Sequence, residues 1–240
     1  MMFQVHTLTL DTMTGAWLLP IVPAVVCAAS GGLVATVLNV KHAQITIFVS
    51  YVLWGVGMTL SILVMALYFH RLAVHKLPNA EVIVSALLPL GPCGQGTFGI
   101  VQLAKASIVA FKNTDIAGIP KAADIVLVIS IIVGLMTWGL GLWWLVHGLA
   151  CVSLKAYSSR LRLNMGFWGF IFPLGVFVAG TISLGETIPS AFMSYLSIVL
   201  LCFLAMLYVA VSIGTVHGAY NRTLLVAPCM TDLEECPSSV

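Results

Sequence analysis

Long runs of apolar residues, separated by short polar segments, fill almost the whole chain. Each run has about 20–27 residues, enough for an α-helix to cross a hydrocarbon core of about 30 Å. A helix is expected because every backbone polar group must find its hydrogen-bond partner inside the lipid. The pattern predicts an all-α membrane protein with six transmembrane helices, at residues 16–38, 44–69, 82–104, 125–149, 166–185 and 191–217.

Prolines divide the six spans into two kinds. The odd spans contain prolines and glycine clusters, whereas the even spans are smooth and rich in Leu, Ile, Val and Trp. Proline kinks a helix and small residues let helices approach closely, so the odd spans are expected inside and the even spans toward lipid. The pattern predicts three hairpins, each with a kinked inner helix and a straight outer helix, as a coarse repeat without a residue-level one.

The third span contains the strongest interruption, because residues 89–96 read PLGPCGQG. Prolines and glycines there free backbone groups, which a bilayer tolerates only where they face protein or water. We therefore expect this segment to line a cavity, a pore or a binding site. A kinked packing helix is the alternative, since Gly and Pro are common in membrane helices. The candidate lining residues in the odd spans are Pro20, Pro23, Pro89, Gly91, Pro92, Gly94, Gln95, Gly96, Thr97 and Pro173.

Composition supports this assignment to the membrane. The 240 residues are 60% hydrophobic and 8% charged, whereas soluble domains have roughly 25% charged residues. The lipid bilayer is therefore an expected partner, and a net charge of +2 gives no reason to expect nucleic acid. The expected organisation is an N-terminal segment at 1–15, a transmembrane domain at 16–218 and a polar tail at 219–240.

Lysine and arginine in short loops favour cytosolic termini. With the N-terminus inside, the cytosolic segments carry six basic residues and the outer loops carry four. The segment 153–164, SLKAYSSRLRLN, is the clearest indication because it has three basic residues and no acid. Basic loops are retained on the cytosolic side, so both the N-terminal segment and the C-terminal tail are predicted to be cytosolic.

The chemistry available in the spans suits passage of a solute better than catalysis. HExxH, GxSxG, paired carboxylates and Cys/His pairs at ligand spacing are absent from the sequence, so no enzyme, metal site or cofactor is expected. Carboxylates in the middle of a span, which proton-coupled pumps use, are absent too. What remains is hydroxyls, the Gln95 amide and backbone N–H groups, which suit a small polar or anionic solute.

The fifth span carries an aromatic cluster next to a proline. It reads WGFIFPL over residues 168–174, with Phe172 directly before Pro173. A ring at a bend in a lining helix can obstruct a pore. Ordinary aromatic packing is the alternative that the residues alone leave open.

Four segments resemble the tellurite-resistance/dicarboxylate transporter family, which includes plant guard-cell anion channels. They are residues 12–32 (TMTGAWLLPIVPAVVCAASGG), 87–105 (LLPLGPCGQGTFGIVQLAK), 167–177 (FWGFIFPLGVF) and 184–192 (LGETIPSAF). The likeness is greatest to the fungal branch of sulfite efflux pumps and malic acid transporters. It implies a ten-helix fold with five hairpins around a pore, kinked odd helices inside, and a phenylalanine obstructing the pore. By motif, that pore gate resembles Phe172.

The resemblance also implies a function. It predicts export of a small anion, sulfite, across the plasma membrane, with transport of malate or another C4-dicarboxylate as the alternative. The six spans match the last six family helices, and the first two hairpins have no counterpart in this sequence. An alternative of another class is therefore a non-transporting fragment or interaction protein, and assembly as a homo-oligomer is a further expectation.

Overall fold

The part of the chain that the structure describes contains six α-helices, joined by turns and short 3-10 helices. This computed structural model describes residues 9–10, 13–76, 83–112, 122–158 and 165–221, and no strand occurs among them. The predicted all-α class is confirmed. The helices are α1 (Val22–Ala35), α2 (Val40–His75), α3 (Leu90–Ala110), α4 (Ala122–Ser158), α5 (Ile171–Thr187) and α6 (Ala191–Tyr220).

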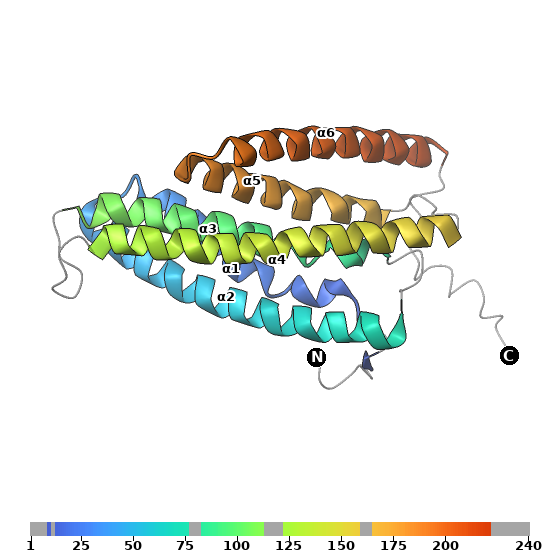
Figure 1. Ribbon diagram of the computed structural model, residues 1–240, viewed down its shortest axis with the longest axis horizontal. Coiled ribbons are helices and arrows are strands. Elements are labelled where there is room, and N and C mark those ends of the chain that lie inside the picture. Colours follow the sequence, from blue (N-terminus) through green and yellow to red (C-terminus); the bar gives the residue numbers. More distant parts are fainter. Residues whose placement is uncertain (1–8, 11–12, 77–82, 113–121, 159–164, 222–240) are drawn as a thin grey trace, which may run out of the picture.

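Helix α3 lies at the centre of the bundle. It contacts α1, α2, α4 and α5, while α6 packs mainly on α5 at one edge (Figure 1). In the most apolar 18-residue stretch of the α3 segment, 83% of the residues are buried. The corresponding share is 28% in α2 and in α4, and 11% in α6. The predicted division into inner odd helices and outer even helices is therefore confirmed.

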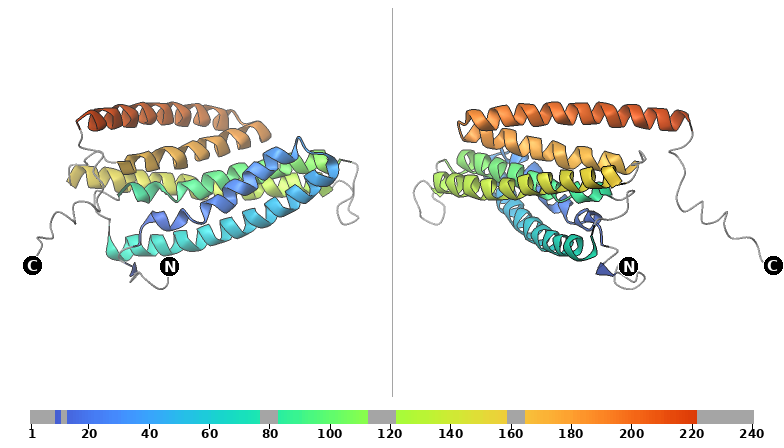
Figure 2. Two further views of the ribbon diagram at one scale, coloured as in Figure 1. Left: turned by 180° about the vertical axis from the view of Figure 1, so that it is seen from behind. Right: turned by 45° about the vertical axis from the view of Figure 1, so that its right-hand side comes forward.

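The even helices are long and uninterrupted, as their smooth sequences predict. Helices α2, α4 and α6 have 36, 37 and 30 residues, and α2 begins where the Asn39 side chain accepts a hydrogen bond from the backbone N–H of His42. They lie on the outside of the shorter odd helices, as the two further views show (Figure 2). Their length exceeds that needed to cross a bilayer core.

The interruptions in the odd spans lie at the starts of the helices, which corrects the expected kinks in their middle. Residues 91–99 form part of one continuous helix, α3. Each odd α-helix is preceded by a short 3-10 helix and has a proline in its first turn, where the lost N–H has no partner in the helix anyway. The 3-10 helices are Gly15–Leu18, Ile83–Leu87 and Met165–Phe170, and the prolines are Pro23, Pro92 and Pro173.

Short-range bonds satisfy the backbone at these junctions. The N–H of Gly91 donates to the carbonyl of Leu88 over 2.9 Å, and the N–H of Ile21 donates to that of Leu18 over 3.0 Å. The tighter 3-10 turns therefore provide hydrogen-bond partners for backbone N–H and C=O groups that would otherwise be unpaired at the two junctions.

The first span is not a single helix. Pro20 lies in a turn, and α1 has only 14 residues, about 21 Å at 1.5 Å per residue. Five of the described helical segments are long and apolar enough to cross a membrane, and α1 is shorter than these. The expected continuous span at 16–38 is therefore wrong in detail, because the Pro20–Pro23 pair restarts the helix.

Candidate functional site

Helices α3 and α5 lie side by side in a fixed register. Lys105 Nζ donates to Glu186 Oε2 over 3.0 Å, and Gln102 Nε2 donates to Ser183 Oγ over 3.5 Å. Both pairs are separated by 81 residues in the sequence. A constant separation means that the two helices run in the same direction without slipping past each other.

The same register continues to the N-terminal ends of the two helices. A Cβ added to Gly91 would lie 3.8 Å from the ring of Phe172 and 3.9 Å from Pro173. Gly91 and Phe172 are again 81 residues apart. A Cβ there would make only ordinary van der Waals contact, so the Phe172 ring lies beside the start of α3 without crowding it. Phe172 is 48% exposed, so its ring also points away from the packed core.

One face of α3 and one face of α5 meet along this register. Residues separated by alternating steps of four and three lie on one face of a helix. We call these two facing rows the inner face. Its residues are Gly91, Gln95, Phe98, Gln102 and Lys105 on α3, with Phe172, Val176, Ala179, Ser183 and Glu186 on α5.

Helix α1 borders the inner face on the other side of α3. A Cβ added to Gly32 of α1 would lie 3.2 Å from Cβ of Gln102, whose amide reaches Ser183 on α5. Gln102 therefore lies between the two neighbouring inner helices. The open side of α3 is partly exposed at Phe98, Gln102 and Lys105, whereas the rest of the helix is almost entirely buried.

The electrostatics of the inner face are simple. Within α1, α3 and α5, Lys105 and Glu186 are the only charged side chains, and they form an ion pair at the C-terminal ends of α3 and α5. The rest of the face offers the amides of Gln95 and Gln102 and the hydroxyl of Ser183. Such a surface can give hydrogen bonds to an anion while carrying one cation at a single end.

Several residues expected to line a pathway pack against neighbouring helices. A Cβ at Gly94 would lie 2.5 Å from the backbone N of Phe177 on α5, and one at Gly96 would collide with the sulfur of Met58 on α2. Thr97 is fully buried against α4, where its Oγ1 lies 3.0 Å from Thr137 Oγ1. These three residues thus hold α3 against three different helices.

The remaining candidates divide between the inner face and its surroundings. Gln95 is 8% exposed and belongs to the inner face with Gly91, while Pro173 contacts Gly91 from α5. Pro20 and Pro23 are exposed at the start of α1. Pro89 caps the N-terminus of α3, and Pro92, in its first turn, is buried.

Of the ten residues of this face, sequence reasoning selected three, Gly91, Gln95 and Phe172. The seven that it did not select are Phe98, Gln102, Lys105, Val176, Ala179, Ser183 and Glu186. Gln102 and Glu186 carry the polar contacts between α3 and α5, and neither was selected from the pattern. The signal that finds them is the shared spacing Pro-x-Gly-x4-Gly-x3-Leu, which begins at Pro92 and again at Pro173. The expectation of a repeat without residue-level correspondence is therefore wrong for these two helices.

The amino-acid sequence matches a known protein family. The model of the SLAC1 family, described as "Voltage-dependent anion channel", matches residues 1–216. The chain belongs to the voltage-dependent anion channel family. No solved structure matches the chain. The family resemblance seen in the motifs is thereby confirmed.

Among curated members of the voltage-dependent anion channel family, fungal transporters are similar to this chain. The sulfite efflux pump SSU1 of Arthroderma benhamiae is 44% identical over 229 residues, covering 93% of this chain and 59% of the pump. The corresponding pump of Trichophyton rubrum is 43% identical over the same coverage. The malic acid transport protein of Schizosaccharomyces pombe is 25% identical over 191 residues, covering 78% of this chain and 43% of that protein. The chain thus spans about 59% of the length of the sulfite pumps.

Proposed function

We propose that the inner face of α3 and α5, bordered by α1, lines a pathway for a small anion across the membrane. The observation that carries the proposal is the register of the face, with Phe172 over Gly91 at one end and Lys105 beside Glu186 at the other. Anion pathways are commonly built from polar groups and single cations that bind weakly enough to release the ion. An enzymatic role has no support from the family.

Sulfite is the substrate that we propose, with efflux across the plasma membrane as the direction. The similarity to sulfite efflux pumps supports it. Malate is the second candidate because a malic acid transport protein is also related. Binding a dicarboxylate requires two cationic or N–H-rich groups. The described parts of α1, α3 and α5 contain one cationic side chain, Lys105, which is paired with Glu186. This favours the small anion.

Phe172 is proposed as the pore gate. Its exposed ring lies over the start of α3, beside Gly91. A large ring across a narrow passage blocks it by bulk and by excluding water. The candidates Gln95 and Gly91 line the passage in this proposal, whereas Gly94, Gly96 and Thr97 shape it through packing.

The test is sulfite efflux from cells that lack their own exporter and express this 240-residue chain, with malate uptake measured in parallel. Phe172→Ala is expected to raise sulfite efflux several-fold, because removing the ring widens the passage. Phe192→Ala is the matched control, since Phe192 is an exposed phenylalanine on the outer helix α6. Both variants must reach the plasma membrane in equal amounts.

The outcomes separate the alternatives. Efflux that rises only in Phe172→Ala supports an anion pathway gated by this ring. Malate uptake without sulfite efflux would mean that malate, and not sulfite, is the substrate. No flux of either anion, with the protein present in the membrane, would favour a non-transporting chain or one that needs further copies of itself to complete a pathway.

A further inference from the structure

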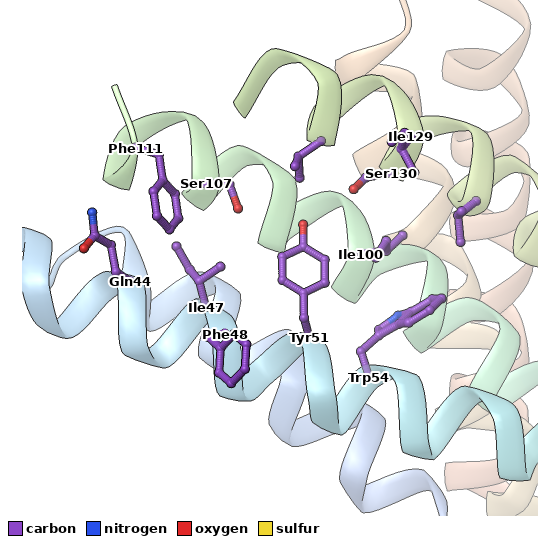
Figure 3. Close-up of a pocket in the computed structure, with 12 residues that line it drawn as sticks. Gln44, Ile47, Phe48, Tyr51, Trp54, Ile100, Ser107, Phe111, Ile129 and Ser130 are labelled. Atoms are coloured by element: carbon purple, nitrogen blue, oxygen red, sulfur yellow. The ribbon is translucent and has the colours of Figure 1, made fainter. Parts of the chain in front are cut away.

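A pocket of about 410 Å³ lies between α2, α3 and α4, away from the inner face (Figure 3). Its volume falls within the range of about 300–1,000 Å³ that is typical of small-molecule sites. The rim includes Phe48 on α2 and Ile129 on α4, which are 71% and 55% exposed. Both helices are long and apolar enough to span a membrane, so the pocket opens toward the lipid.

The walls of the pocket combine flat aromatic rings with isoleucine and valine side chains. Phe48, Tyr51 and Trp54 contribute from α2, and Phe111 follows the end of α3. The pocket extends along α2 from Gln44 to Trp54, which is about 15 Å at 1.5 Å per residue. An elongated pocket with rigid ring walls fits a flat, rigid, apolar molecule, because such a molecule loses little conformational freedom when it binds.

Deep in the pocket lies a small group of hydroxyls. The hydroxyls of Tyr51, Ser107 and Ser130 point toward one another across the three helices (Figure 3). The Ser107 hydroxyl donates to the carbonyl of Leu103 in its own helix over 2.8 Å. The Tyr51 oxygen is buried beside the Ser107 and Ser130 hydroxyls, with which it forms only weak hydrogen bonds. A buried hydroxyl that is only weakly bonded is unfavourable, so a ligand that brings a hydroxyl would bond it more fully.

We infer that this pocket binds a membrane sterol, with the rings of the sterol against the aromatic walls and its hydroxyl bonded to Tyr51. The bilayer supplies the ligand directly, because the rim is exposed and apolar. A phospholipid acyl chain would fill the apolar volume too, but it is flexible and has no hydroxyl for Tyr51. The site is independent of the proposed anion pathway, so its test needs no transport assay.

The experiment uses the purified 240-residue chain in phosphatidylcholine vesicles with a photoreactive sterol that keeps its hydroxyl. Saturable labelling is expected on α2, α3 and α4 around the pocket, located by mass spectrometry and displaced by unlabelled sterol. Tyr51→Phe keeps the ring and removes the hydroxyl. It is expected to weaken sterol binding about fivefold, the factor typical of one lost hydrogen bond.

A pair of substitutions on α4 tests the location. Ile129→Trp places a large ring at the rim and is expected to abolish saturable labelling. Ile132→Trp makes the same change at a residue of equal exposure, 54% against 55%, that does not line the pocket, and labelling should persist. Circular dichroism and size-exclusion profiles like those of the unsubstituted chain would show that both variants fold.

Three results would overturn the inference. The first is labelling that does not saturate or that spreads over the lipid-facing surface. The second is equal labelling of Ile129→Trp and Ile132→Trp. The third is labelling of the pocket by a photoreactive phosphatidylcholine that sterol does not displace, which would assign the pocket to an acyl chain.

Discussion

Thr97 illustrates what a polar residue does inside an inner helix. Its hydroxyl donates to the carbonyl of Cys93 over 2.8 Å and lies 3.0 Å from the hydroxyl of Thr137 on α4. Serine and threonine in membrane helices commonly bond to their own helix and to a neighbour. The contribution of Thr97 is therefore to hold α3 against α4.

Removing this hydroxyl tests that role. Thr97→Val is expected to lower the free energy of unfolding by about 0.6 kcal/mol, and by at most about 1.7 kcal/mol, the range for interhelical hydrogen bonds in membranes. The measurement is unfolding in mixed micelles followed by fluorescence. Thr36→Val is the control, because Thr36 is exposed and bonds only within its own segment. Equal losses in the two variants would contradict an interhelical role.

The ion pair at the end of the inner face is a second feature at this scale. Lys105 and Glu186 are 33% and 62% exposed, so solvent screens their attraction. In the proposed pathway Lys105 attracts the anion and Glu186 competes for it. Lys105→Gln should lower sulfite efflux and Glu186→Gln should raise it, each about two- to fivefold, in keeping with the ~1 kcal/mol or less of an exposed pair.

The double variant completes this comparison. With both charges removed, efflux should return toward that of the unsubstituted chain, since the two effects oppose each other. A fall of similar size in both single variants would instead mean that the pair only holds α3 to α5. The amount of each variant in the plasma membrane must be equal for their efflux rates to be compared.

At the scale of elements, the close approach of α3 and α5 depends on glycine. The two helices meet where Gly94 faces the backbone of Phe177 and where Gly180 lies against the carbonyl of Gly94. A Cβ at Gly180 would lie 2.8 Å from that carbonyl oxygen. Small residues allow such backbone contact in membranes, and the register of the inner face follows from it.

Adding one methyl group tests this contact. Gly94→Ala is expected to destabilise the fold by about 1–3 kcal/mol, as overpacking does, because its Cβ would meet backbone atoms. Gly139→Ala is the matched control on α4, where a Cβ would meet nothing within 4 Å. There the better helix propensity of alanine should stabilise slightly. Thermal unfolding in detergent measures both, and equal shifts would contradict the close contact.

The sequence carried much of this element-level information. Prolines and glycines in the odd spans predicted which helices lie inside, and Pro92 with Pro173 also mark the register of α3 and α5. Composition does not tell which way a side chain points, because that depends on the rotation of each helix, set by contacts between residues 81 positions apart. For this reason Thr97 was expected to line a pathway, while Glu186 was not selected.

At the scale of the whole molecule, the direction in which each helix runs determines which helix ends lie on the same side of the membrane. Cys93 lies near Gly141, and Thr97 lies near Gly134, so α3 and α4 run in opposite directions. The C-terminal ends of α3 and α4 therefore lie at opposite ends of the bundle (Figure 1). Whichever side holds one of them, the other lies across the membrane.

Thiol labelling in intact cells tests the proposed orientation with cytosolic termini. Lys112→Cys, in the exposed turn after α3, should react with a membrane-impermeant maleimide added outside, because basic segments such as 153–164 keep the opposite end in the cytosol. Tyr157→Cys, near the end of α4 and 97% exposed, should react only after permeabilisation. The unsubstituted chain gives the background from its own cysteines. The reverse pattern would place the N-terminus outside, and the Lys105–Glu186 pair would then face the cytosol and meet the anion at entry instead of exit.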